Sequence, residues 1–256
     1  MIVSKKIKKV KIGQKKVVIV FDDLDKLEIS PNVYTEYNLF PNKCLSKRDI
    51  DEIKSRNDID KYNSYATKLL SNKQYSTSSI KDKLSKKGAN EAQIEEVIKL
   101  LIKYQLLDDS LLIKEYLEYA DYKHFGYNRI REDLIKKGIP IYKIDKIKYD
   151  EKRELKLAKE ILKDLEKKYS KYNHFQIKKH CYDALIRLGY GFDIAKEVVE
   201  NISPMNKKKE MELLKIDYQK AKAKYEKKYH GYELTEKINN SLMQKGYKYE
   251  HIKEIK

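Results

Sequence analysis

The sequence contains no tryptophan, two cysteines, four prolines and eight glycines in 256 residues. Scarce glycine and proline leave few tight turns, which argues against an all-β fold and favours a mainly helical one. Cys44 and Cys181 are too few and too far apart for a disulfide framework, so a reducing compartment is expected. No apolar stretch approaches the ~18 residues of a membrane span, and the basic N-terminus has no signal-peptide core. The sequence therefore predicts a soluble, cytoplasmic protein.

Acidic residues are also in deficit: 57 lysines and arginines face 40 aspartates and glutamates, giving a net charge of +17. Only six of the basic residues are arginine. AT-rich coding DNA explains part of the lysine excess, but it does not explain why there are fewer acidic residues than basic ones. A field of this sign attracts polyanions, with nucleic acid first and acidic lipid surfaces second.

What is abundant is repetition. A pattern of an apolar residue, three spacers, leucine, three spacers and glycine occurs four times, and the glycines are 50, 51 and 57 residues apart. The four occurrences are Ile80/Leu84/Gly88, Ile130/Leu134/Gly138, Cys181/Leu185/Gly189 and Ile238/Leu242/Gly246. Apolar residues four apart share one helix face, and glycine just past a helix end adopts the left-handed conformation without a Cβ penalty. We therefore predict four helices that end at these structural repeat glycines.

A longer helix is predicted before each glycine-ended one, and a short helix after it. The longer helices are expected at about 60–71, 109–123, 151–169 and 207–229. Each three-helix unit is too small to be very stable alone, so neighbouring units are expected to stack into an elongated, curved α array. The predicted segments are a 1–58 extension and three-helix repeats at 59–108, 109–150, 151–203 and 204–256.

The first sixty residues break this pattern. "KKIKKVKI" and "KVVIVF" are β-prone runs separated by Gly13-Gln14, which predicts a hairpin, and "LEIS" is a candidate third strand. Residues 1–20 hold seven lysines and no acid, so the hairpin is a basic ribbon. Ser46 followed by Asp49 predicts the start of a helix at 46–56.

Candidate catalytic and metal-binding residues are weak. Asp23 and Asp25 follow a hydrophobic strand, as in Mg²⁺-dependent phosphatases, but that chemistry needs a parallel sheet with crossover helices, which this chain cannot supply. Asp108 and Asp109 are typical of a helix N-cap. His174, His180 and Cys181 lack the second cysteine pair of a zinc site. We predict no catalytic residue, no metal and no cofactor.

Basic side chains are the remaining candidates for a binding site, either for DNA or for a protein partner. The predicted contacts are Arg129, Arg131, Lys136, Lys137, Lys178, Lys179 and Arg187. Arginine presents a planar fork suited to phosphate or carboxylate, and we expect the pair at 129 and 131 to project outward with the following lysines. An ordinary solvated face, partly neutralised by Glu132 and Asp133, remains an equal alternative. Most of the 22 tyrosines are expected at seams between helices, and the lysines of 207–228 on a solvated helix.

Two stretches resemble the RecX family of bacterial recombination regulators. In "FGYNRIREDLIKKGI" the family pattern is filled by Gly126, Arg129, Ile130, Leu134, Lys137, Gly138 and Ile139. In "LLDDSLLIKEYL" it is filled by Leu107, Asp108, Asp109 and Tyr116. Tyr127 stands where many members carry proline, and Leu112 replaces the usual phenylalanine. The resemblance covers roughly 62–201, and the N-terminal strands and fourth repeat look like those of the longer members.

The resemblance implies tandem three-helix repeats and a non-enzymatic role in DNA repair and the SOS response. Family members bind the RecA recombinase on single-stranded DNA and control its filament. We therefore expect a cytoplasmic, monomeric regulator that inhibits filament growth, ATP hydrolysis and strand exchange. Duplex DNA is a further candidate partner, and no membrane partner is expected. Two alternatives stay open: a stand-alone DNA-binding protein built of basic three-helix units, and a phosphohydrolase using Asp23 and Asp25.

Overall fold

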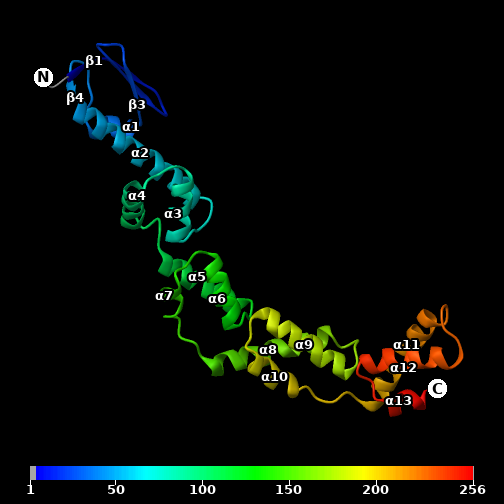
Figure 1. Ribbon diagram of the computed structural model, residues 1–256. Helices are drawn as coiled ribbons and strands as arrows, with labels where there is room; N and C mark the ends of the chain where they lie inside the picture. The colour runs from blue at the N-terminus through cyan, green and yellow to red at the C-terminus, as the bar shows by residue number, and fades with distance from the viewer. Residues whose placement is uncertain (1–3, 256) are drawn as a thin grey trace. The chain divides into compact units, whose positions relative to one another are not determined.

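The computed structural model describes residues 4–255, and it begins with a small antiparallel sheet (Figure 1). Its strands are β1 (Ser4–Ile12), β2 (Val17–Phe21), β3 (Lys26–Ile29) and β4 (Cys44–Ser46), in the order β3-β2-β1-β4. Gly13 donates its backbone N–H to the Lys16 carbonyl at 3.0 Å and closes the β1–β2 hairpin. The predicted hairpin and third strand are confirmed. The strand β4 was not predicted, because three residues are too few to show the alternation of apolar and polar residues that marks a strand.

One face of the sheet is covered. Val17, Ile19 and Phe21 alternate on β2 with half-buried residues, and they pack with Ile7 and Ile53 in one apolar cluster. This face lies against α1 (Pro31–Glu36) and the first turns of α2 (Lys47–Leu70). The short helix α1 was also missed by the sequence patterns.

The helix α2 corrects one prediction, because the expected helices at 46–56 and 60–71 are a single 24-residue helix. Ser46 and Asp49 form the predicted capping box at its start. No glycine or proline interrupts the chain at 57–60, so nothing stops the helix there. Asn57 has a low intrinsic helix preference, but its buried side chain accepts a hydrogen bond from the Ser30 backbone N–H at 2.8 Å. One helix therefore serves both the sheet core and the next helical core, which includes Ala66.

The rest of the described chain is helical. The helices after α2 are α3 (Thr77–Lys86), α4 (Glu91–Lys103), α5 (Asp109–Tyr122), α6 (Tyr127–Lys136), α7 (Ile141–Ile144), α8 (Glu151–Lys168), α9 (His174–Leu188), α10 (Phe192–Glu200), α11 (Lys207–Tyr225), α12 (Gly231–Gln244) and α13 (Tyr249–Glu254). The prediction of a mainly α chain with a small N-terminal β segment is confirmed. No helix of residues 4–255 is long and apolar enough to cross a bilayer.

Packing divides the chain into two units, and each is described by itself. The first holds residues up to Glu115 together with Ile135–Lys143, and the second holds Tyr116–Leu134 and the chain from Ile144 onward. The outermost residues of the predicted first and last segments, 1–3 and 256, lie outside the described part of the chain.

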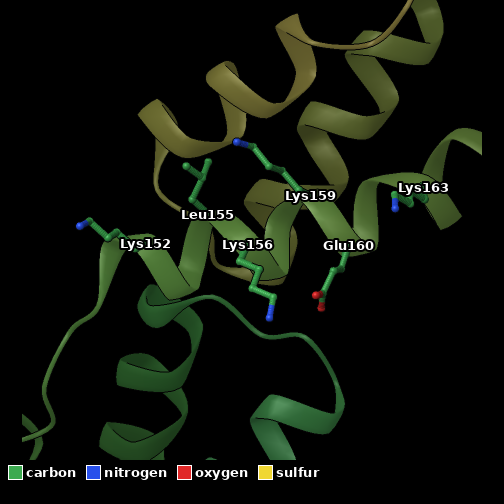
Figure 2. Close-up of a pocket in the computed structure, with 6 residues that line it drawn as sticks. All are labelled: Lys152, Leu155, Lys156, Lys159, Glu160 and Lys163. Atoms are coloured by element: carbon green, nitrogen blue, oxygen red, sulfur yellow. The ribbon is translucent and has the colours of Figure 1, made fainter.

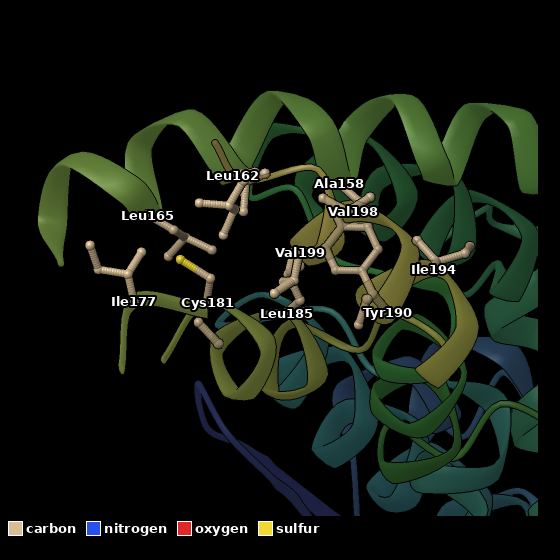
Figure 3. Close-up of a cluster of buried hydrophobic side chains, with 13 residues drawn as sticks. Ala158, Leu162, Leu165, Ile177, Cys181, Leu185, Tyr190, Ile194, Val198 and Val199 are labelled. Carbon is tan, nitrogen blue, oxygen red and sulfur yellow. The ribbon is translucent and has the colours of Figure 1, made fainter. Parts of the chain in front are cut away.

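The helix α8 shows how sequence period sets packing in the second unit. Its exposed side carries lysines three and four residues apart, including Lys152 and Lys156 (Figure 2). Its opposite side buries Ala158 and Leu162 against α9 and α10 (Figure 3). Cys181, which holds the apolar position of the repeat, is fully buried in this cluster.

The four repeat glycines lie just beyond α3, α6, α9 and α12, which we call the glycine-ended helices. Their backbone φ angles are +96° at Gly88, +79° at Gly138, +91° at Gly189 and +88° at Gly246. These values lie in the left-handed region, so the prediction of a glycine at each helix end is confirmed.

Candidate functional site

Three of the four glycine-ended helices, α6, α9 and α12, meet the start of another helix at their C-terminal end. In the first unit, the hydroxyls of Ser76 and Ser79 donate hydrogen bonds to the Lys137 carbonyl at 2.6 and 3.0 Å. Ser76 is the N-cap of α3, and Lys137 follows the last residue of α6. We call this contact the Gly138 joint, since Gly138 packs on the same two serines.

Two further joints lie in the second unit. In the Gly189 joint, the backbone N–H groups of Gly126 and Asn128 donate to the carbonyls of Leu188 and Gly189 at 2.8 and 3.1 Å. In the Gly246 joint, the Asn173 side-chain amide donates to the Lys245 carbonyl at 2.9 Å. Each joint brings the positive start of one helix to the negative end of another, so the orphan carbonyls at that end gain donors.

Arg129, one of the predicted contact residues, lies in the Gly189 joint. Its guanidinium carbon is 3.7 Å from the centre of the Phe125 ring, and its Nε is 3.6 Å from Asp133. Its Nη1 also donates to the Arg187 carbonyl at 3.5 Å. These contacts hold the guanidinium against protein groups, which gives Arg129 a positioning role between α6 and the end of α9.

Arg131 points elsewhere, with its Nη2 3.9 Å from Asp145. The expectation that Arg129 and Arg131 project together is therefore wrong. Residues two apart on a helix do not face each other, and these two flank the buried stripe of Ile130 and Leu134 on opposite sides. Lys136 and Lys137 are exposed at the end of α6.

The predicted residues of α9 also separate. Lys178 is half-buried and donates to the Glu200 carbonyl at 3.4 Å. Lys179 and Arg187 are exposed and lie on the side of α9 away from its buried positions. Of the three basic residues on this helix, Lys179 and Arg187 are the two that are open to a partner.

A basic surface outside the predicted contact residues runs along α8. The α8 lysine stripe consists of Lys152, Lys156, Lys159 and Lys163, which line a surface hollow with Leu155 and Glu160 (Figure 2). Lys159 is 3.6 Å from Glu197 on α10, while the stripe as a whole keeps an excess of positive charge. Steps of four, three and four residues place these lysines on one face over about 16 Å. This spacing was visible in the sequence and could have found the stripe.

The candidate phosphatase residues are engaged in an ion pair. Lys5 Nζ is 2.6 Å from Asp23 Oδ2 and also contacts Asp25, in the turn between β2 and β3. The hydrogen bond from Lys5 holds the pKa of the Asp23 carboxyl below its ordinary value. All paired strands of residues 4–255 are antiparallel, so the parallel framework expected for this chemistry is not found there.

The neighbouring carboxylates Asp108 and Asp109 do different work. Asp108 caps α5, accepting from the Ser110 backbone N–H at 2.7 Å. Asp109 is 4% exposed and reaches the start of α3, where it accepts from the Thr77 backbone N–H at 2.8 Å; it also pairs with Lys143 at 2.8 Å. Burial alone would raise the pKa of the Asp109 carboxyl, but the hydrogen bonds from Lys143 and Thr77 outweigh it and lower the pKa. Asp109 is thus a buried structural link.

The histidine and cysteine candidates do not converge either. His180 lies between the rings of Tyr169 and Tyr172, at centroid distances of 5.1 and 4.6 Å. Burial raises the pKa of the Cys181 thiol to about 11, so the thiolate that metals bind is disfavoured. No group of three metal-binding side chains occurs among residues 4–255.

Comparison with known proteins finds relatives that match most of the chain. No family model matches the chain. The regulatory protein RecX of Lactococcus lactis is 28% identical over 239 residues, which cover 91% of this chain and 88% of the relative. The regulatory protein RecX of Streptococcus mutans is 27% identical over 97% of both chains. The chain is similar to these RecX proteins over nearly its whole length.

A solved structure agrees on the fold. A crystal structure of a regulatory protein RecX aligns with a TM-score of 0.60 at 21% identity, covering 77% of this chain and all of that one. Most of the motif residues that carried the resemblance lie at the joints or in the core, while the exposed Asp108 caps α5. Gly126 and Arg129 form the Gly189 joint, Ile130 and Leu134 are buried, and Gly138 packs on α3. The motif therefore marks how the helices join.

Proposed function

We propose that the chain is a non-enzymatic regulator of homologous recombination that binds the RecA–single-stranded DNA filament and inhibits its growth, ATP hydrolysis and strand exchange. The observation that carries the proposal is the similarity to proteins named regulatory protein RecX over more than nine-tenths of this chain. The net charge of +17 is consistent with a partner that displays DNA phosphates.

Within this proposal, contacts to the filament come from exposed basic side chains on several helices. They are the α8 lysine stripe, Lys179 and Arg187 on α9, and Lys136 and Lys137 at the end of α6, together with the half-buried Arg131. Single exposed charges contribute little, at most about 1 kcal/mol each. Several such contacts on one chain multiply through effective concentration, so a weakly binding face can still obstruct an adding subunit or an incoming strand.

The test is RecA-catalysed ATP hydrolysis on circular single-stranded DNA, measured while the protein is titrated in. We expect the hydrolysis rate to fall with increasing protein. A stripe variant replaces three of its lysines with glutamate: Lys152→Glu, Lys156→Glu and Lys163→Glu. It should raise the concentration for half-inhibition about tenfold, corresponding to roughly 1.4 kcal/mol of lost binding.

A matched control changes the same net charge elsewhere. Lys215, Lys220 and Lys222 are exposed on α11, and replacing all three with glutamate should shift half-inhibition less than about twofold if location matters. A second variant, Lys179→Glu with Arg187→Glu, tests α9 in the same assay. Normal ATP hydrolysis at saturating wild-type protein would sink the proposal itself, and equal losses in the stripe and control variants would remove the stripe from it.

The second candidate is a DNA-binding protein that acts without a recombinase. The basic surfaces favour it as much as they favour the filament, because phosphates are the shared target. Co-sedimentation with single-stranded DNA across a salt series, with and without RecA, separates the two. Binding that RecA does not strengthen, and that falls steeply with salt, would support the stand-alone role.

A further inference from the structure

The outer face of the N-terminal sheet carries a dense, uniform charge. Strand register decides which residues share it: Lys9 pairs with Val20 and Lys11 with Val18, and Val18 and Val20 alternate with the buried residues of β2. On β3, Lys26 lies opposite Val20 and Glu28 opposite Val18. The lysines of the outer sheet face are Lys6, Lys8, Lys9, Lys11 and Lys26.

Little in the sheet neutralises this face. Glu28 forms an ion pair with Lys16, with 2.9 Å between its Oε1 and the Lys16 Nζ. Asp23 and Asp25 pair with Lys5, which lies opposite Leu45 and therefore belongs to the covered face. Within residues 4–255, the ion pairs of the β1–β2 segment involve Lys5 and Lys16, and no carboxylate lies within ion-pair distance of Lys8, Lys9 or Lys11. The charge of the outer face is therefore available to an outside anion.

The side chains of the outer sheet face indicate which kind of polyanion it can bind. The aromatic residue of the described strands, Phe21, is buried under the sheet, and the outer face offers only the aliphatic Val18 and Val20 between its lysines. Single strands are held without sequence preference by stacking their bases on aromatic rings, which this face lacks. A duplex needs no stacking, because it presents closely spaced phosphates on its outside.

We propose that the outer sheet face is a duplex-DNA binding surface that contacts backbone phosphates and reads no sequence. The lysines of β1 extend over about 17 Å, from Lys6 to Lys11 at roughly 3.3 Å per residue, which matches about five base-pair steps. The register shift between Ile7 and Lys9 leaves Lys8 as an unpaired extra residue of β1, and Lys8 is exposed next to the outward-facing Lys9.

The test is fluorescence anisotropy with a labelled 30-base-pair duplex over a NaCl series, with no recombinase present. The outcome therefore does not depend on the proposed filament role. The sheet variant is Lys8→Gln with Lys9→Gln and Lys11→Gln, three exposed side chains whose loss leaves the sheet core intact. We expect the duplex Kd to rise at least tenfold and the slope of log K against log salt to fall by about 2.7, or 0.9 per phosphate contact.

The matched control is Lys215→Gln with Lys220→Gln and Lys222→Gln, which removes the same charge from α11 and should change the duplex Kd less than about twofold. Equal effects of the two variants would overturn the proposal, since net charge alone would then explain binding. A larger loss of affinity for a labelled single strand than for the duplex would overturn the choice of duplex. Loss of binding to phosphatidylserine vesicles with duplex binding unchanged would make the face a lipid surface instead. A far-UV circular dichroism melt matching the wild type confirms that the variant is folded.

Discussion

The Gly138 and Gly189 joints both supply hydrogen-bond donors to the free carbonyls at a helix end, but they use different groups. At the Gly138 joint, serine hydroxyls bridge to the Lys137 carbonyl, and a Cβ added to Gly138 would lie 2.8 Å from the Ser76 hydroxyl oxygen. At the Gly189 joint, backbone donates to backbone, and an added Cβ would overlap the backbone nitrogen of Arg129. Side-chain hydroxyls can rotate or give way, but backbone in a helix cannot.

The difference teaches that four glycines with nearly the same φ do not carry the same constraint. Gly88 has a positive φ of +96°, yet the nearest atom to an added Cβ is the Tyr62 hydroxyl at 3.8 Å. Conformation alone accounts for glycine at Gly88, whereas close approach adds a second requirement at Gly189. Substitutions at these glycines and at the residues around the joints should therefore differ in their cost to stability.

The largest effect is expected for Gly189→Ala. An alanine Cβ would overlap the first turn of α6, so the joint must open or shift, at more than about 4 kcal/mol. Hydrogen exchange checks it directly, because the amides of Gly126 and Asn128 donate in this joint and should lose protection.

Replacing Gly189 with asparagine distinguishes the requirement for a positive φ from the requirement for space beside the backbone. Asparagine tolerates positive φ far better than alanine but still carries a Cβ. Gly189→Asn should therefore be as damaging as Gly189→Ala, while Gly88→Asn should be close to neutral. A Gly189→Asn variant with wild-type amide protection would contradict the close-approach argument and leave backbone conformation as the whole explanation.

The next largest effect is expected for Asp109→Ala. This change leaves Lys143 and the Thr77 N–H without their buried partner, at a cost of about 3 kcal/mol in the free energy of unfolding. The adjacent Asp108→Ala removes only the cap of α5 and should cost about 1 kcal/mol. Urea unfolding followed by far-UV circular dichroism measures both, and equal losses would mean that the buried link adds nothing.

The pKa of Asp109 gives this prediction a pH signature. Its folded-state pKa is lowered, so its contribution to stability is complete above the unfolded value of about 3.9 and is lost as pH falls through the folded value. The stability gap between wild type and Asp109→Ala should therefore be constant near neutral pH and narrow below about pH 4. A gap that stays constant down to the acid limit of the folded state would contradict the paired, ionised carboxylate.

A smaller effect is expected from the hydroxyls of the Gly138 joint. Ser76→Ala removes both the N-cap of α3 and a hydrogen bond to Lys137, for about 1–2 kcal/mol. Ser79→Ala removes the bond to Lys137 and the contact between the two hydroxyls but leaves the N-cap in place, so it should cost less. Thermal unfolding of the two variants and their double mutant checks this, and a larger loss for Ser79→Ala would reverse the assigned roles.

The four repeat glycines show which features of the fold the sequence could predict and which it could not. The spacing to Ile80, Leu84 and their counterparts predicted all four helix ends, because apolar period and the left-handed cap are local properties. The joints could not be predicted, since nothing in the pattern distinguishes Gly88, which has room for a Cβ at ordinary contact distance, from Gly189, with backbone beside it. The contact that adds the constraint comes from residues about sixty positions away.

The candidate site shows the same limit. Arg129 and Arg131 look like a pair in the sequence, but a spacing of two sends their side chains to different sides of α6. Asp108 and Asp109 look equivalent, yet one caps its own helix and the other is buried against Lys143. The α8 lysine stripe has a regular helical period, so the sequence does contain its signal.

The smallest effect is expected for Gly88→Ala, and it sets the baseline for the comparison. A β-carbon there would meet only the Tyr62 hydroxyl, at an ordinary contact distance of 3.8 Å, so the cost is the left-handed strain of alanine, reduced by the entropy that alanine removes from the unfolded chain. The net loss should be about 1 kcal/mol, measured as the shift in urea midpoint with unchanged slope. Because φ is similar at Gly88 and Gly189, this value is also the conformational share of the loss at Gly189. Similar losses from Gly88→Ala and Gly189→Ala would show that helix ending, and not the joint, is what the repeated glycine serves.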